Sequence, residues 1–258
     1  MLPTQQSTLE GNVGEIFSSI QGEGPLIGRR QIFVRIAGCS LSCSYCDTLG
    51  FGKRVGTCRI EHPPASGCFA IIPNPISVKA VKEQIDRLRS PGLHSVSITG
   101  GEPLCQHEFV GALADECRSS GMRVYLETNG YSASRFEEIV DVIDFSAIDL
   151  KLPSHRACSD SEWPDLIENE LACTRISSEK GVYTIVKIVI LSGTQASEVE
   201  EVCLRLRDID AFIVLQPASG VQEPKSIDLI HFHEEASRYL GPDKVAVIPQ
   251  AHKLMGVM

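Results

Sequence analysis

Short apolar runs recur along the chain and alternate with segments of helical period. The runs are rich in Val and Ile, as is typical of buried parallel strands. They cover residues 31–36, 95–99, 123–127, 145–150, 184–190, 211–216 and 244–248. Between most of them apolar residues recur every three or four positions. This second period predicts helices over residues 77–88, 108–120, 197–208 and 228–240.

Alternating strands and helices build a parallel sheet, either an open doubly wound sheet or a full or partial (β/α) barrel. In both architectures the active site lies at the carboxyl ends of the strands. Polar motifs directly follow the first four predicted strands, at residues 39–48, 100–103, 128–130 and 151–154. We therefore expect these four motifs to meet at one rim of the sheet.

Two segments break the alternation. Residues 50–76 are rich in Gly and Pro without a clear period, which predicts an excursion loop or a small insertion. Residues 153–180 are expected, less firmly, to be irregular as well.

Composition narrows the class of protein. The 258 residues have an ordinary globular composition, and we expect one domain over residues 1–258. A net charge of −9 argues against nucleic acid as a direct partner, so a small molecule is the expected substrate. No apolar stretch approaches the roughly 20 residues that span a bilayer, and the N-terminus lacks the pattern of a secretion signal. These features predict a cytoplasmic protein without a membrane partner.

Three cysteines lie close together on the loop after the first predicted strand. Cys39, Cys43 and Cys46 form a C-x3-C-x2-C pattern, and thiolates spaced in this way hold iron–sulfur clusters. Three protein ligands leave one iron of a four-iron cluster open, which favours chemistry over scaffolding. Structural zinc is the rival, but it needs four ligands, and Cys58 and Cys68 supply no matching pair. Three buried core thiols are the remaining alternative.

This loop resembles that of the radical S-adenosylmethionine superfamily, in which an aromatic residue, here Tyr45, precedes the last cysteine. The second superfamily signature, GGEP, stands at residues 100–103 and contacts the amino group of S-adenosylmethionine in that superfamily. A glycine pair beside a carboxylate suits an ammonium group. The resemblance implies a [4Fe–4S] cluster on the three cysteines, which cleaves S-adenosylmethionine reductively to a 5′-deoxyadenosyl radical. It also implies an incomplete or distorted (β/α) barrel of the radical SAM type.

A tighter resemblance, to the 7-carboxy-7-deazaguanine synthase family, covers most of the chain. The similar segments are EIFSSIQGEGPLIGRRQIFVRIAGCSLSCSYCDT (15–48), SITGGEPL (97–104), YLETNG (125–130), IDLKLPS (148–154), LQP (215–217) and PQAHKLMGV (249–257). The resemblance implies a carbon–nitrogen lyase that converts 6-carboxy-5,6,7,8-tetrahydropterin to 7-carboxy-7-deazaguanine with loss of ammonia. The product is a precursor of queuosine and archaeosine. Mg²⁺, a reducing protein such as a flavodoxin or ferredoxin, and a homodimeric assembly are implied too.

Site residues follow from the matching motif positions. For S-adenosylmethionine they are Tyr45, Cys46, Asp47, Gly101, Glu102, Glu127, Thr128 and Asn129, with Asp149 and Lys151 at the exit of the fourth strand. For the pterin they are the backbone of Ile20, Gln21 and Gly22, the side chains of Arg35 and Thr99, and the terminal carboxylate of Met258. The Arg fork suits a carboxylate because it binds bidentately. Thr48 is the implied Mg²⁺ ligand, with substrate and water completing the octahedron.

Structural alternatives stay open for several of these residues. Arg35 could be a salt-bridged strand residue, and Thr48 a turn or N-cap residue. Glu127 could be a buried carboxylate paired with Lys151. His252 could pack the tail or contact substrate.

The remaining cysteines give little support for a second metal site. Cys58 and Cys68 make a poor auxiliary cluster, and their segment is better explained as a lid or dimer contact. Five scattered cysteines are expected to be core thiols: Cys105, Cys117, Cys158, Cys173 and Cys203. Two rival functions remain, a radical-generating activase that acts on a protein glycine and a zinc-binding interaction module. The activase leaves EIFSSIQGEG and the HKLMGV ending unexplained.

Overall fold

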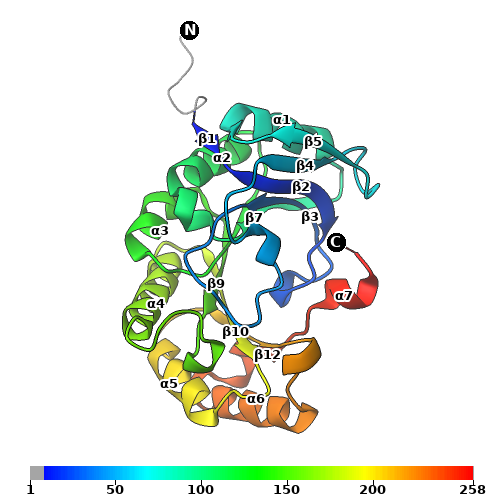
Figure 1. Cartoon of the computed structure of the whole chain (residues 1–258). Helices are drawn as coiled ribbons and strands as arrows, with labels where there is room; N and C mark the ends of the chain where they lie inside the picture. Colours follow the sequence, from blue (N-terminus) through cyan, green and yellow to red (C-terminus); the bar gives the residue numbers. More distant parts are fainter. Residues whose placement is uncertain (1–8, 258) are drawn as a thin grey trace.

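A curved, largely parallel sheet with helices on its outer side forms the body of the protein (Figure 1). The computed structural model describes residues 9–257. Within that range ten strands form the main sheet. In spatial order they are β12 (Val245–Val247), β11 (Phe212–Pro217), β10 (Tyr183–Ile190), β9 (Phe145–Leu150), β8 (Val124–Thr128), β7 (Leu93–Gly100), β3 (Arg30–Ile36), β2 (Val13–Ile20), β4 (Thr57–Glu61) and β5 (Phe69–Pro73). The strands from β12 to β3 are parallel to their neighbours, and all seven predicted strands are among them.

The sheet does not close. Its edges, β12 and β5, do not pair with each other in the described residues, so the structure is an incomplete barrel, as the sequence predicts. The strand β2 runs antiparallel to β3, and β4 runs parallel to β2.

Helices connect the parallel strands and bury one apolar stripe each against the sheet. They are α1 (Val78–Leu88), α2 (His107–Ser119), α3 (Ala133–Ile139), α4 (Trp163–Glu179), α5 (Ala196–Leu206) and α6 (Ser226–Leu240). A further short helix near the C-terminus, α7 (Ala251–Met255), has no buried residue and connects no strands. The Ser77 hydroxyl caps α1 by accepting a hydrogen bond from Ala80 N. All four predicted helices are present. Among residues 9–257 no helix combines the length and apolar character that crossing a membrane requires.

The prediction of an irregular segment at residues 153–180 is wrong, because α4 occupies most of it. Its buried stripe includes Leu166, Ile167 and Leu171, but also the polar Glu170 and Thr174. Polar residues at buried positions break the apolar period on which the sequence prediction depends.

Residues 50–76 also contain more structure than expected. Strands β4 and β5 form an antiparallel hairpin at the edge of the sheet, and β6 (Ile76–Ser77) pairs with β1 (Glu10–Gly11). Only β4 turns buried apolar residues, Cys58 and Ile60, to the core, while most of β5 is exposed. The apolar signal of this hairpin is therefore weak.

Candidate functional site

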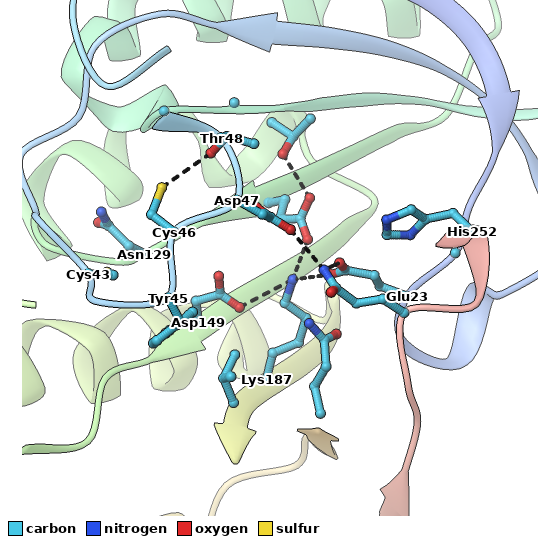
Figure 2. A pocket seen from close by; sticks show the side chains of 18 of the residues that line it. Glu23, Cys43, Tyr45, Cys46, Asp47, Thr48, Asn129, Asp149, Lys187 and His252 are labelled. Carbon is cyan, nitrogen blue, oxygen red and sulfur yellow. Dashed lines mark hydrogen bonds and ion pairs between the residues drawn. The ribbon is translucent and has the colours of Figure 1, made fainter. Parts of the chain in front are cut away.

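Six neighbouring strands each place a polar side chain on the inner face of the sheet, near the carboxyl end of the strand. They are Arg35 on β3, Thr99 on β7, Glu127 on β8, Asp149 on β9, Lys187 on β10 and Gln216 on β11. On the last four strands the residue two positions earlier belongs to one apolar cluster, made of Tyr125, Ala147, Ile185 and Val214. Because side chains alternate along a strand, the apolar layer fills the barrel and the polar layer lies above it. The polar residues line a cavity of about 470 Å³ (Figure 2), a typical volume for a small-molecule site.

Lys187 lies at the centre of the ionic contacts, although the sequence analysis did not select it. Its Nζ is 2.6 Å from Glu23 Oε2, 2.5 Å from Glu127 Oε1 and 3.3 Å from Asp149 Oδ1. Burial alone would lower the pKa of Lys187, but the three carboxylates hold it well above its usual range. Burial acts to raise the pKa of Asp149, yet Lys151 and Lys187 outweigh it and the net shift is downward. Glu127 is thus paired with Lys187 and not with Lys151.

Lys151 joins the cysteine loop to the strands. Its Nζ is 3.4 Å from Asp149 Oδ2 and donates a hydrogen bond of 3.1 Å to Tyr45 Oη. Tyr45 Oη is 3.3 Å from His155 Nδ1, while His155 Nε2 is 2.7 Å from the carbonyl oxygen of Val189. Because a carbonyl only accepts, His155 carries its proton on Nε2. Burial lowers the pKa of His155 to about 3, so the ring is neutral.

The loop at residues 39–48 has no helix or strand of its own in the described chain. Its backbone is held by the segment after β9: Ser42 N donates to the carbonyl of Ala157 at 2.9 Å, and Ser44 N to that of His155 at 3.1 Å. Both carbonyls lie in the first part of residues 153–180, before α4 begins, so this stretch outside α4 holds the loop.

The GGEP motif also supports the cysteine loop. Gly101 N donates to the carbonyl of Ile36, and Glu102 N donates to that of Gly38, both at 2.7 Å. A Cβ atom at Gly101 would lie 2.3 Å from the Gly38 oxygen, so only glycine fits here. Gly100 has a φ of +127°, which a residue with a side chain rarely adopts. The glycine pair therefore lets the backbone of the GGEP motif approach the cysteine loop closely.

Cys39, Cys43 and Cys46 are partly exposed and all line the cavity. The backbone N–H of Leu41 and the side-chain amide of Asn129 lie 3.5 and 3.8 Å from Cys39 Sγ. Burial raises the pKa of Cys39 to about 11 and raises that of Cys43, so a metal has to displace protons from these thiols. Three soft donors on one loop, with N–H groups beside the sulfur, fit an iron–sulfur cluster.

Neither metal has a preformed site. Among residues 9–257 no three His, Cys, Asp or Glu side chains, Cys39, Cys43 and Cys46 included, are grouped closely enough to hold an ion. Cys58 is buried in β4 and Cys68 is exposed at the start of the β5 hairpin arm. Cys117, Cys173 and Cys203 are buried core thiols, as expected. The expectation was wrong for Cys105 and Cys158, which are only partly buried. Cys105 lies in a 3-10 turn (Pro103–Gln106) after β7, and Cys158 lies in the loop before α4.

Glu102 is completely buried and links two of the rim loops. Its carboxylate accepts hydrogen bonds from Leu104 N at 2.8 Å, Thr128 Oγ1 at 2.6 Å and Asn129 N at 2.7 Å. Burial raises the pKa of Glu102 to about 7, although these hydrogen bonds oppose the shift. The carboxylate therefore has a structural function, and its predicted contact with S-adenosylmethionine stays a prediction. Thr128 and Asn129 both line the cavity.

The loop that follows β2 is folded around one side chain. Gln21 is buried, and its Oε1 accepts hydrogen bonds from Gly22 N at 2.8 Å and Glu23 N at 3.1 Å. Ile20, Gln21 and Gly22 line the cavity, where the sequence analysis expected them. The Gly22 carbonyl already accepts a hydrogen bond of 2.8 Å from Ala251 N.

Arg35 lies in the cavity wall and is ion-paired at the same time. Its Nε donates to Glu15 Oε1 at 2.9 Å, and its guanidinium lies over the rings of Phe17 and Phe51. The salt-bridged alternative is therefore present, but this ion pair uses Nε, and the two Nη groups carry further N–H donors. The predicted contact with a substrate carboxylate stays a prediction.

Two threonines occupy the expected places. Thr48 Oγ1 is 3.6 Å from Cys46 Sγ (Figure 2), and Thr48 precedes a short 3-10 turn without capping it through its side chain. The N-cap alternative is thus not realised by the hydroxyl, which lines the cavity. Thr99 Oγ1 donates to Glu127 Oε2 at 2.7 Å.

The C-terminal segment covers one side of the cavity. Gln250 Nε2 donates to Glu23 Oε1 at 2.7 Å and to Asp47 Oδ2 at 3.0 Å, so it joins two loops. His252 packs directly on Gly22, where a Cβ atom would lie 2.4 Å from its Nδ1. Figure 2 shows the ring beside Glu23. Met258 lies outside the described residues.

Lys187, Glu23 and Gln216 are among the cavity residues that the sequence did not single out. Two of them could have been found from the family motifs, because Glu23 belongs to QGEG and Gln216 to LQP. Lys187 belongs to no such motif and is one polar position inside an apolar strand. The Oε1 atom of Gln216 is buried without a hydrogen-bond partner in the described structure. A buried acceptor of this kind at a cavity wall suits a ligand N–H group.

Comparison with known proteins places the chain. The Radical SAM superfamily profile matches residues 33–206. The 7-carboxy-7-deazaguanine synthase of Thermococcus kodakarensis is 36% identical over 95% of this chain and 98% of its own length. Those of Methanothermobacter thermautotrophicus and Geobacter sulfurreducens are 37% and 36% identical, each over 94% of this chain and 96% of theirs.

Solved structures agree on the fold. The crystal structure of QueE from Escherichia coli covers 89% of this chain and 90% of its own, with a TM-score of 0.57 and 18% identity. A radical SAM methyltransferase from Sphaerobacter thermophilus covers 86% of this chain and 66% of its own, with a TM-score of 0.61 and 16% identity. At such identities the likeness concerns the barrel alone. Sequence similarity over nearly the whole length carries the assignment: the chain belongs to the 7-carboxy-7-deazaguanine synthase family of the radical SAM superfamily.

Proposed function

We propose that this protein converts 6-carboxy-5,6,7,8-tetrahydropterin to 7-carboxy-7-deazaguanine with loss of ammonia. The observation that carries the proposal is the convergence of the family motifs, from Ile20 to His252, on one cavity of small-molecule size. Family membership favours this reaction over a protein-glycine activase and over a zinc-binding module. The product would serve 7-deazapurine biosynthesis, as for queuosine or archaeosine.

As a member of the radical SAM superfamily the enzyme uses a [4Fe–4S] cluster and S-adenosylmethionine. When bound, they supply a carbon radical that abstracts hydrogen from substrate. Cys39, Cys43 and Cys46 would hold the cluster. Residues for S-adenosylmethionine would come from Tyr45, Asp47, Gly101, Glu102, Glu127, Thr128, Asn129, Asp149 and Lys151, all of which line the cavity.

The protein's own contribution is placement and charge. The backbone N–H and C=O groups of Gln21 and Gly22 already have partners within the protein, so a guanine-like edge would meet the second lone pairs of the two carbonyl oxygens. Arg35 would face the carboxylate with its Nη donors, which its ion pair with Glu15 does not use. Thr48 lies beside the cluster loop, where its hydroxyl would join substrate oxygens and water around Mg²⁺. Gln216 supplies a buried acceptor without a partner among the described residues.

The enzyme acts on a small molecule and depends on a reductant. Within the proposal the donor is a small redox protein such as a flavodoxin or ferredoxin, the enzyme is a homodimer, and it works in the cytoplasm.

Anaerobic reconstitution with iron and sulfide tests the proposal. The reconstituted enzyme is incubated with the tetrahydropterin, S-adenosylmethionine, Mg²⁺ and dithionite, and products are identified by mass spectrometry. The expected product is 7-carboxy-7-deazaguanine, formed without stoichiometric loss of S-adenosylmethionine. Accumulation of 5′-deoxyadenosine without the deazapurine would retain the superfamily and refute the substrate.

A further inference from the structure

We propose that Lys187 is a positioning residue that fixes the carboxylates of Glu23 and Glu127 as ionised hydrogen-bond acceptors for the substrate. The inference rests on the proposed function, because it concerns the same cavity. It starts from the placement of one ammonium group among three carboxylates that come from three different elements.

The ammonium group is buried among carboxylates. Lys187 is 4% exposed, and its Nζ contacts Glu23 on the loop after β2, Glu127 on β8 and Asp149 on β9. Two of its three N–H donors make hydrogen bonds, to Glu23 Oε2 and Glu127 Oε1, whereas Asp149 Oδ1 is an ion-pair contact at 3.3 Å without hydrogen-bond geometry. Lys187 is thus placed to act on substrate through Glu23 and Glu127, the two carboxylates to which it is hydrogen-bonded.

The partners are held on their other sides as well. Glu127 Oε2 accepts from Thr99 Oγ1, and Glu23 Oε1 accepts from Gln250 Nε2. Each carboxylate therefore has two donors at fixed positions and keeps further lone pairs that these donors do not use. Both carboxylates line the cavity, as does Lys187 itself; Figure 2 shows Glu23 and Lys187.

A reduced pterin presents a ring N–H and an amino group along one edge, both of them donors. Carboxylates are the acceptors that bind such an edge most strongly, provided that they are ionised. Without Lys187, Asp149 keeps its ion pair with Lys151, but the partly buried carboxylates of Glu23 and Glu127 have no other ion-pair partner among the described residues. They then repel one another, which favours binding of a proton. A protonated carboxyl group would turn a donor toward the substrate's own donors.

Other titratable groups face this centre but do not replace the ammonium. Tyr125 approaches from β8 below, and its hydroxyl is buried and neutral because burial raises its pKa well above its usual range. Lys151 contacts Asp149 but is engaged with Tyr45 on the far side of the cavity. Asp47 reaches Glu23 only through Gln250.

The test compares Lys187→Met and Lys187→Arg with the wild-type, reconstituted enzyme. Lys187→Met should raise KM for 6-carboxytetrahydropterin by about 10- to 100-fold, in the range of other supporting-shell changes. The KM of Lys187→Met should fall when it is measured at increasing pH, between about 6 and about 8, because the uncompensated carboxylates lose their proton. The KM of the wild-type enzyme should not show this dependence. Lys187→Arg keeps the charge and should recover part of the loss.

A second readout does not require catalysis. Buried carboxylates that bind protons more tightly in the folded state than in the unfolded state destabilise the fold increasingly as pH rises. The Tm difference between wild type and Lys187→Met should therefore be larger at about pH 8 than at about pH 6. The matched control is Lys82→Met, which removes a similarly buried lysine paired with Asp86 on α1, away from the cavity. Its Tm difference should be the same at both pH values.

Lys187→Met combined with Glu127→Gln removes one positive and one negative charge, and it should be more stable than Lys187→Met alone. The proposal is overturned if Lys187→Met has a wild-type KM without pH dependence. A double variant no more stable than the single one, or a Tm difference that matches the Lys82→Met control at both pH values, also overturns it. Failure of the wild-type enzyme to convert the pterin would refute the proposed function, and the two stability comparisons would still decide the role of Lys187.

Discussion

The cavity has two walls of opposite character, one built by strands and one built by loops. On the strand wall Lys187 on β10 forms ion pairs with Glu127 on β8 and Asp149 on β9. On the loop wall the thiols of Cys39, Cys43 and Cys46 stand on a segment without regular structure, held by a few backbone hydrogen bonds.

The two walls differ in whether the protein alone completes the functional groups of the site. Strand register fixes the charged groups relative to one another, so their electrostatic field is complete in the protein alone. The thiols are raised in pKa by burial, and only a metal completes their site. We therefore expect substitutions on the loop wall to affect cofactor binding, and those on the strand wall to affect stability and substrate affinity.

The largest expected effect concerns the loop wall. Cys43→Ala should abolish cluster binding and activity completely, because a three-ligand cluster does not tolerate the loss of one thiolate. The fold should persist, since the barrel does not depend on this loop. Iron and sulfide content with far-UV circular dichroism checks both parts. The control is Cys68→Ser, an exposed thiol whose variant should bind iron as the wild type does.

Glu102 joins the two walls and should make stability depend on pH. Burial raises its pKa from 4.5 to about 7, so its contribution is present at low pH and is lost as pH rises from about 4.5 through about 7. The shift corresponds to at most about 3 kcal/mol. Urea unfolding across this pH range measures it. Subtracting the profile of Glu102→Gln, which cannot titrate, should isolate the slope, and parallel profiles would contradict the assignment.

Gly101→Ala should disturb the contact between the GGEP motif and the cysteine loop. Its Cβ atom would meet the Gly38 and Phe51 carbonyls at 2.3 and 2.6 Å, so the loop has to shift. Overpacking of this kind costs about 1–3 kcal/mol, and iron content should fall as well. Gly193→Ala is the control, because no atom lies within 4 Å of its added Cβ. Equal iron content in both variants would argue against a supporting function for this glycine.

The smallest expected effect belongs to Gln250, which bridges Glu23 and Asp47 and so joins two loops at the cavity. Gln250→Ala should destabilise the protein by only about 1 kcal/mol, the usual net value of such hydrogen bonds. Substrate KM should rise several-fold, because the C-terminal segment no longer holds both loops. Lys244→Ala, an exposed ion-paired residue, should change neither value. An unchanged KM in Gln250→Ala would mean that this bridge is not needed for binding.

Much of the barrel could be predicted because its strands are apolar on both faces. The apolar runs at residues 184–190 and 145–150 predict buried strands without any knowledge of the neighbouring elements. The motifs that follow parallel strands lie at one rim of the sheet. The cluster ligands could be predicted for a related reason: their spacing is local, and three soft ligands within one loop need no tertiary information. Segments whose burial depends on a partner could not be predicted in this way. In helix α4 the polar residues Glu170 and Thr174 occupy buried positions and interrupt the apolar period of the helix. In the hairpin of β4 and β5 only β4 is largely buried.

The sequence by itself determined the repeated strands and helices, the cysteine loop and the motifs that converge on the cavity. Tertiary structure decided how the charges are paired. Glu127 forms its ion pair with Lys187 and not with Lys151, and Arg35 forms one with Glu15. Glu102 accepts hydrogen bonds that link two of the rim loops. A local pattern specifies which groups reach the rim, whereas pairing depends on the register between strands. That register is set by packing across the whole sheet.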